Sequence, residues 1–358
     1  MRVAVLGAGN GGQASAAHLA LLGHRVTLYD RFPDAVSAFQ DDRRLTVTGA
    51  VEGLAEMELV TSDLADCLAA GADVILVSLP AFALEWLAEA VAPLVSPGTT
   101  FVLHPGGTGG ALRVRELWRA LGAGEGVLLA ETETLVYACR LAGPGRPDIK
   151  AVKRSVSLAA LPASATAQAL QLFSTLYPQA RAANSVLETG LANLNPVMHP
   201  AIVLGNARAV EHGVGFDFYG EGVSPGIAAL IDAVDRERVA IAARLSVDHV
   251  SLYEWVARAY GVRATDTVRL CRTMSEEVYR GIRSPDGLSS RYVVEDVPYG
   301  LVPWSELGRA CGVVTPVIDA MIEITSVLSG ADHRAEGRRL EKLGLDGLDA
   351  IGLRRAVA

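Results

Sequence analysis

Residues 3–12 read Val-Ala-Val-Leu-Gly-Ala-Gly-Asn-Gly-Gly, an apolar strand that runs directly into a glycine-rich turn. The first glycine permits a tight turn, the second lets the backbone approach a pyrophosphate, and the third lets the following helix pack closely on the strand. The N–H groups that open the helix attract phosphate. A glycine pattern alone is weak evidence, but this context predicts a dinucleotide site. Its expected contacts are Gly7, Gly9, Asn10, Gly11 and Gly12.

A carboxylate and an arginine lie at the end of the second predicted strand, Arg25–Tyr29. Asp30 lies about 18 residues past Gly12, where it can accept hydrogen bonds from an adenosine ribose. This carboxylate favours NAD, because a 2′-phosphate would meet a like charge. Arg31 can contact such a phosphate, which leaves NADP open, although the other interpretation of Arg31 is a solvated loop residue. NAD is therefore the expected cofactor, with NADP as the alternative.

Two further turns follow predicted strands, at Leu79-Pro80-Ala81 and at residues 104–110. Ligands of doubly wound sheets lie at the carboxyl ends of strands, so we expect Pro80 and the second turn to line the nicotinamide half of the cofactor site. His104 is a candidate second base. A histidine that ends a buried strand is more often a hydrogen-bonded structural residue, and we favour that interpretation.

Strands and helices alternate in the first half of the chain, which predicts an α/β, doubly wound Rossmann domain over residues 1–183 with a parallel sheet covered on both faces. The expected strands are Arg2–Leu6, Arg25–Tyr29, Asp73–Leu79, Thr99–Leu103, Gly126–Ala130 and Val156–Leu161. The expected helices are Ala14–Leu22, Phe82–Val91, Ala111–Ala120 and Ser164–Leu176.

Apolar residues recur three and four apart beyond that point, which is typical of helices. We therefore predict a mostly α-helical second domain over residues 184–358. The segments with the helical period are Leu187–Gly213, Gly226–Leu245, Ser251–Tyr260, Trp304–Cys311 and Pro316–Ser329.

Composition narrows the function classes. The 358 residues carry a net charge of −8 without a run of basic residues, which argues against a nucleic-acid partner. Four scattered cysteines show no metal-ligand spacing, so we expect reduced thiols and no metal site. Neither a signal peptide nor a membrane span is indicated. The expected location is the cytoplasm.

One histidine interrupts an apolar stretch of the second domain. The segment Asn193-Leu194-Asn195-Pro196-Val197-Met198-His199-Pro200 places His199 between two prolines, where a helix should bend. A buried histidine at such a bend is a plausible acid/base. From the residues alone, a satisfied core histidine is an equally good interpretation.

The chain resembles the opine dehydrogenases, the octopine/nopaline dehydrogenase family, essentially from end to end. The glycine turn is shared with many dehydrogenases and does not discriminate between families. The segment ending in His199-Pro200 and the stretch Glu295-Asp296-Val297-Pro298-Tyr299-Gly300-Leu301-Val302-Pro303 are more specific. Further similar stretches are Tyr279–Ile282 and Glu336–Gly344.

The resemblance implies a reductive condensation, in which the amine of an L-amino acid adds to a pyruvate-like 2-oxo acid and the imine receives hydride from NAD(P)H. By this similarity His199 is the acid/base and Asp296 its paired carboxylate. Asn195, one helical turn before His199, is expected to bind substrate or the cofactor amide. Arg280 and Arg291 are candidates for gripping substrate carboxylates, although a surface salt bridge is about as good an interpretation for each.

Two rival functions stay open. A keto-acid, hydroxy-acid or glycerol-phosphate dehydrogenase typically uses a lysine after the nucleotide domain, and here only Lys342 lies there. A non-catalytic redox sensor would not need His199 together with Asp296. The sequence leaves open which amino acid and 2-oxo acid react, the product stereochemistry, the physiological direction and the oligomeric state, with a homodimer as one option.

Overall fold

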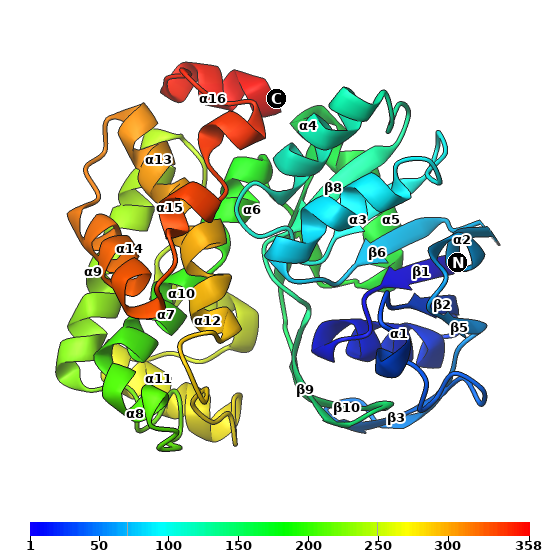
Figure 1. Ribbon diagram of the computed structural model, residues 1–358, viewed down its shortest axis with the longest axis horizontal. Helices are drawn as coiled ribbons and strands as arrows, with labels where there is room; N and C mark the ends of the chain where they lie inside the picture. Colours follow the sequence, from blue (N-terminus) through cyan, green and yellow to red (C-terminus); the bar gives the residue numbers. More distant parts are fainter. Residues whose placement is uncertain (70, 249) are drawn as a thin grey trace. The chain divides into compact units, whose positions relative to one another are not determined.

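The computed structural model describes residues 1–69, 71–248 and 250–358, and it divides the chain into two units (Figure 1). The first unit comprises residues 1–106 and 110–182. The second comprises residues 183–358 together with the short segment 107–109. The α/β fold class expected from the sequence is confirmed, since a doubly wound sheet comes first and a helical unit follows.

The larger sheet of the first unit is almost entirely apolar, as expected for strands covered on both faces. Its strands run in the spatial order β12 (Ala180–Ala182), β11 (Val156–Leu161), β8 (Leu128–Thr132), β7 (Thr100–Leu103), β6 (Val74–Val77), β1 (Arg2–Leu6), β2 (Arg25–Tyr29) and β5 (Leu59–Thr61). The helices of this unit are α1 (Asn10–Leu21), α2 (Leu64–Ala69), α3 (Leu84–Val91), α4 (Gly110–Leu121) and α5 (Thr166–Leu176).

The prediction of a parallel sheet is wrong at one strand. β11 pairs antiparallel with β8, with Leu158 opposite Thr132 and Leu161 opposite Leu129. Parallel neighbours need a crossover connection, usually a helix. Here the chain leaves β8, forms the hairpin β9 (Tyr137–Gly143) and β10 (Arg146–Val152), and returns into β11 in the opposite direction.

That hairpin belongs to a smaller sheet that the sequence analysis did not foresee. Its strands run in the order β4 (Gly53–Glu56), β3 (Arg44–Gly49), β10 and β9. Helix α1 lies between this sheet and the larger one (Figure 1), so α1 is buried on two sides. Small side chains suit this position, and Ala14, Ala16 and Ala17 are fully buried. α1 begins at Asn10, earlier than expected.

Among the described residues of the second unit, the regular elements are helices, and β pairing is limited to an isolated bridge between Asp217 and Arg283. Its helical elements are α6 (Val186–Ala192), α7 (Asn195–Gly205), α8 (Ala207–Glu211), α9 (Pro225–Arg244), α10 (Leu252–Tyr260), α11 (Thr267–Glu277), α12 (Arg291–Val294), the π-helix η4 (Val297–Leu301), α13 (Val302–Cys311), α14 (Pro316–Ser329), α15 (His333–Glu336), the 3₁₀ helix η5 (Leu340–Leu343) and α16 (Ala350–Val357). The predicted helix Pro316–Ser329 has the expected bounds.

Helix α9 organises the second unit, because it packs against α6, α7, α11, α13 and α14. Its buried Arg238 pairs with Asp235 and donates to the carbonyls of Leu191 and Val250. A buried guanidinium must satisfy its N–H groups, and these bonds tie α9 to the chain on either side of it.

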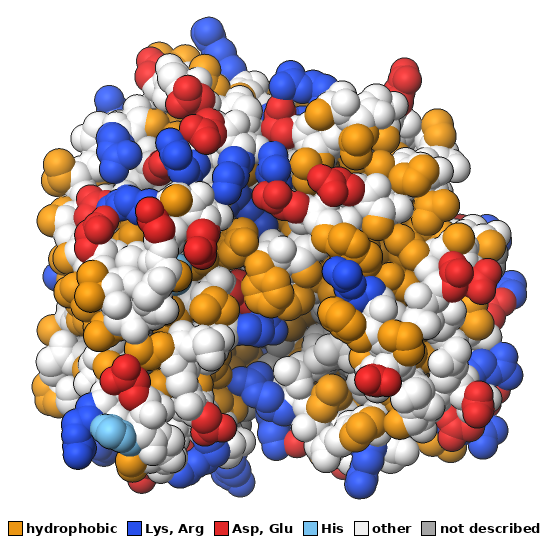
Figure 2. Space-filling model, viewed as in Figure 1, with side chains coloured by type: hydrophobic (Ala, Val, Ile, Leu, Met, Phe, Trp, Pro, Cys, Tyr) orange, Lys and Arg blue, Asp and Glu red, His pale blue; other side chains and the backbone are white. Residues whose placement is uncertain are grey.

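Charged side chains of both signs share the surface of this unit (Figure 2). Arg334 bridges Asp319 and Glu323, and Arg339 bridges Glu306 and Glu341. Such partly exposed pairs contribute little to stability, but they leave this part of the surface without a single-sign field. Within the described residues, no helix has the length and apolar character that a membrane span requires.

Candidate active site

The glycine turn has the geometry that a dinucleotide needs. Gly7 adopts φ +107°, and a Cβ there would lie 2.5 Å from the Ser78 carbonyl oxygen, so only glycine fits. A Cβ on Gly12 would overlap the Gly7 carbonyl. Gly9 is exposed, caps the N-terminus of α1, and has no atom within 4 Å of its would-be Cβ. The start of α1 is thus open to a phosphate, and these residues fit a dinucleotide.

The other two residues of the turn face the protein. The Asn10 Oδ1 atom accepts a hydrogen bond from the Leu141 N–H of β9 at 2.8 Å. A Cβ on Gly11 would lie 2.7 Å from the Ser78 hydroxyl. The Asn10 side chain therefore ties the smaller sheet to the start of α1. A cofactor contact by Asn10 or Gly11 stays a prediction. It would have to come from the backbone of these residues, because the Asn10 side chain bonds to β9.

Asp30 follows β2 directly and is held by two backbone groups. Its Oδ2 accepts from the Ala8 N–H at 2.7 Å, and its Oδ1 accepts from the Phe32 N–H at 3.0 Å. Both bonds fix the carboxylate beside the glycine turn. The ribose contact expected of Asp30 stays a prediction, but this position is compatible with it.

Arg31 is exposed, and its guanidinium carbon lies 4.1 Å from the ring centre of Trp86 in α3. This cation–π contact packs the exposed side chain against α3, and a phosphate contact by Arg31 stays a prediction. Pro80 is half-buried and precedes the short 3₁₀ helix η2 (Ala81–Ala83). Its contact with the cofactor stays a prediction.

His104 has the contacts of a structural residue. It is fully buried, its Nδ1 lies 2.8 Å from the Thr132 hydroxyl, and its Nε2 accepts from the Val136 N–H. The ring of Tyr177 stacks on it at 5.5 Å. Burial lowers the pKa of His104 to about 3, so the imidazole is neutral at physiological pH. These contacts agree with the structural interpretation.

His199 and Asp296 form a buried pair in the second unit. The Nδ1 atom of His199, in α7, lies 2.7 Å from the Oδ2 atom of Asp296, which directly precedes η4. Their exposed fractions are 7% and 6%. Burial raises the pKa of the Asp296 carboxyl, while the neighbouring His199 acts in the opposite direction. The pair resembles the base and orienting carboxylate of known acid/base sites.

Local sequence brings the two elements together. Pro196 occupies the first turn of α7, where its missing N–H costs nothing. A Cβ on Gly300 of η4 would overlap the Pro196 ring, so the glycine permits this close approach. The Leu301 N–H donates to the Asp296 carbonyl five residues back, as in a π-helix, a form that is frequent at functional sites.

Two tyrosines that the sequence analysis missed also contact His199. The Tyr219 hydroxyl lies 2.8 Å from His199 Nε2, and the Tyr292 ring centre lies 4.1 Å from the imidazole. Phe218 packs against both tyrosine rings. The available signal was the aromatic run at 216–219 within a glycine-rich loop, which does not by itself point to a histidine on another element.

The predicted substrate residues lie near the surface. Asn195 is exposed and opens α7, one turn before His199. Arg280 is exposed and donates to the Glu276 carbonyl of α11, within its own segment. Arg291 opens α12 and pairs with Glu295 at 2.5 Å. Both arginines make local contacts, and their substrate roles stay predictions.

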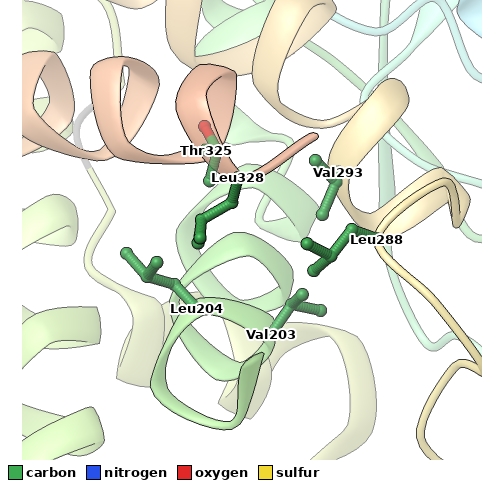
Figure 3. A pocket seen from close by; sticks show the side chains of 6 residues that line it. All are labelled: Val203, Leu204, Leu288, Val293, Thr325 and Leu328. Carbon is green, nitrogen blue, oxygen red and sulfur yellow. The ribbon is translucent and has the colours of Figure 1, made fainter. Parts of the chain in front are cut away.

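A small cavity in the second unit is not large enough for a substrate. Figure 3 shows its lining, which comes from α7, α12, α14 and the loop before α12: Val203, Leu204, Leu288, Val293, Thr325 and Leu328. Its volume of about 10 Å³ is at the lower limit for holding one water molecule, and its walls are apolar. No cluster of metal-ligating side chains occurs among the residues that the structure describes.

Comparison with known proteins decides the family. Residues 182–329 match the family described as NAD/NADP octopine/nopaline dehydrogenase, alpha-helical domain, and residues 3–132 match ketopantoate reductase PanE/ApbA. An opine dehydrogenase from Arthrobacter sp. (strain 1C) is 42% identical over 355 residues, which cover 99% of this chain and 98% of the relative. The chain belongs to the opine dehydrogenase family. It is accordingly an NAD(P)-dependent oxidoreductase, as the resemblance implied.

Solved structures agree on the fold. A structure of octopine dehydrogenase with NADH and L-arginine has a TM-score of 0.78 and 24% identity, over 98% of this chain and 97% of that one. A yersinopine dehydrogenase with bound NADP⁺ has a TM-score of 0.75 and 17% identity, over 100% and 98%. Opine dehydrogenases thus include proteins solved with either dinucleotide, so the choice between NAD and NADP in this family member depends on its own residues.

Proposed function

We propose that this member of the opine dehydrogenase family joins an L-amino acid to a 2-oxo acid. The amine adds to the keto carbon, water leaves, and reduction of the imine gives an N-(carboxyalkyl) amino acid; the reverse oxidation follows the same path. The observation that carries the proposal is the buried His199–Asp296 pair. Both His199 and Asp296 lie within residues 182–329, the segment that matches the family's helical domain.

His199 acts as the acid/base of this reaction. A protonated amine must lose a proton before it can attack, and the hydroxyl of the carbinolamine must gain one before it leaves as water. Imidazole titrates near neutral pH and suits both transfers. Asp296 accepts the Nδ1–H bond, which fixes the tautomer with Nε2 as the exchanging nitrogen and stabilises the imidazolium.

Residues of the first unit hold the cofactor. The open start of α1 at Gly9 takes the pyrophosphate, and Asp30 takes the adenosine ribose. The bound dinucleotide supplies the hydride that reduces the imine. We infer NAD as the preferred form, because the Asp30 carboxylate repels a 2′-phosphate, with Arg31 as the residue that leaves NADP accessible.

Substrate carboxylates need fixed cations. Of the two candidates, Arg291 stands closer to the acid/base pair, since its carbonyl accepts the Asp296 N–H at 3.3 Å and its charge acts on the Asp296 carboxyl. We assign it the carboxylate of the 2-oxo acid. Arg280 and Asn195 are secondary candidates. A pyruvate-like 2-oxo acid is favoured, since a solved octopine dehydrogenase is described in complex with NADH and pyruvate.

A simple keto-acid reductase is the second candidate, favoured by the match of residues 3–132 to ketopantoate reductase. The product separates the two functions. The protein is incubated with NADH, pyruvate and a panel of ¹⁵N-labelled L-amino acids, and the mixture is analysed by mass spectrometry. We expect a labelled secondary amine that contains both carbon skeletons. Lactate as the sole reduced product would reject the condensation and favour the reductase.

A further inference from the structure

The Tyr219 hydroxyl lies beside Nε2 of His199, the nitrogen that exchanges protons in the proposed reaction. Its hydroxyl lies 2.8 Å from Nε2, whereas Asp296 holds Nδ1 on the other side of the ring. The exposed fraction of Tyr219 is only 5%, close to that of His199. A proton that leaves or reaches Nε2 therefore meets the Tyr219 hydroxyl.

The loop that carries Tyr219 is firmly held. The Phe218 N–H donates to the Ile282 carbonyl, and the Ser284 N–H donates to the Phe216 carbonyl. Asp217 accepts from the Ser275 hydroxyl and from the Gly220 N–H through one carboxylate oxygen. These bonds fix the backbone on both sides of Tyr219.

Aromatic rings hold the Tyr219 ring itself. Phe218 packs edge-on with a centroid distance of 5.1 Å, and Tyr279 lies at 4.6 Å with its ring tilted by 31°. The Tyr279 hydroxyl donates to the Tyr260 hydroxyl at 3.1 Å. The position of the Tyr219 hydroxyl is thus set by packing, and it does not depend on the bond to His199 alone.

We propose that Tyr219 is the proton relay between His199 and the reacting substrate atom. This inference rests on the proposed function. A hydroxyl donates one bond and accepts others, so it can receive and release a proton in one concerted step. Carboxylates and guanidinium groups lack this ability at neutral pH.

The transfer balances in both directions. When the carbinolamine loses water, the imidazolium Nε2–H bond breaks and its proton joins the Tyr219 oxygen, while the Tyr219 O–H bond breaks and its proton joins the departing hydroxyl. Neutral His199 and neutral Tyr219 remain, with Nδ1–H still bound to Asp296. When the substrate ammonium is deprotonated, the same bonds form and break in reverse order.

The test compares Tyr219→Phe with Tyr253→Phe. The Tyr253→Phe substitution also removes a hydroxyl that forms hydrogen bonds, here with Thr267 and Asp232. These bonds do not involve His199. We expect Tyr219→Phe to lower kcat roughly 10- to 100-fold, which is at or below the lower end of the scale of acid/base effects because His199 remains, and to change the pH profile of kcat. NADH affinity, measured by fluorescence titration, should stay within about twofold. Tyr253→Phe should leave kcat and the pH profile unchanged.

A second variant separates proton transfer from packing. Incorporation of 3,5-difluorotyrosine at position 219 keeps the ring and the hydroxyl but makes the phenol more acidic. If Tyr219 is the relay, the pH profile of kcat shifts relative to the wild-type protein. An unchanged profile in this variant, or full kcat in a folded Tyr219→Phe protein, overturns the inference. Absence of any condensation by the wild-type protein would instead reject the proposed function.

Discussion

The Nδ1 atom of His199 lies 2.7 Å from the Oδ2 atom of Asp296, although the two residues are 97 positions apart along the chain. Neither residue gains much from this contact in water, since both would be well solvated there. Burial makes the bond matter, because water no longer competes for the two side chains; the same loss of water raises the pKa of the Asp296 carboxyl, and the bond to His199 opposes that shift. We therefore expect a change in either residue to affect the other.

Asp296→Asn removes the charge that orients His199 and keeps the size of the side chain. We expect kcat to fall roughly 100- to 10,000-fold, because an amide can stabilise the unproductive tautomer and cannot stabilise the imidazolium. Steady-state kinetics and an NADH titration measure the effect. Asp319→Asn, at a partly exposed ion pair, is the matched control. A variant with wild-type kcat would remove the pair from the mechanism.

Arg291→Gln removes the cation that we assign to the 2-oxo acid. A charge-assisted bond contributes about 1.5–3 kcal/mol, so the KM for that substrate should rise roughly 10- to 100-fold. Arg280→Gln should change it by less than about threefold, because that side chain bonds to a carbonyl of its own segment. Equal effects of the two substitutions would contradict the assignment of Arg291.

Asp30→Ala tests the choice of cofactor. Removal of the carboxylate relieves the repulsion of a 2′-phosphate, so the affinity ratio of NADP to NAD should rise by about tenfold or more, the equivalent of roughly 1.4 kcal/mol. Titration of protein fluorescence with each reduced dinucleotide measures the ratio. Asp34→Ala, an exposed residue four positions further on, serves as the control. An unchanged ratio in Asp30→Ala would count against the role of Asp30.

His104 should make stability depend on pH. Its pKa is about 3 in the folded protein and near 6.5 when unfolded, so between these values the unfolded chain binds the extra proton. The free energy of unfolding should therefore fall as the pH drops from 6.5 toward 3, by up to about 1.4 kcal/mol per pH unit from this residue.

Denaturant unfolding at several pH values measures that dependence in the wild-type protein and in His104→Gln. The slope should be smaller in the variant. His212→Gln, at an exposed position, should keep the wild-type slope. Identical slopes in all three proteins would mean that His104 is not held neutral by the fold.

The parts of the structure that local sequence encodes were predictable. The strand Arg2–Leu6 and the glycine turn depend on neighbouring residues, so an apolar run followed by glycines sufficed. The reversed direction of Val156–Leu161 was not predictable, because an apolar run is the same in either direction. The smaller sheet was not predicted, because strands such as Arg44–Gly49 are short and largely exposed and so lack a continuous apolar run.

The candidate site shows the same limit. His199 drew attention through its flanking prolines, but its pairing with Asp296 was inferred from the family resemblance, since no local pattern links residues so far apart. Tyr219 was missed altogether. Its contact with His199 depends on how a loop after α8 packs against α7, which is a property of the tertiary fold.

The most direct test of the central claim follows NADH absorbance with pyruvate and a panel of L-amino acids, supplied separately and together. The proposed condensation predicts oxidation of NADH only when both substrates are present, and its loss in His199→Ala while NADH still binds. Oxidation with the 2-oxo acid alone, at the same rate with or without an amino acid, would contradict the account and make the protein a keto-acid reductase.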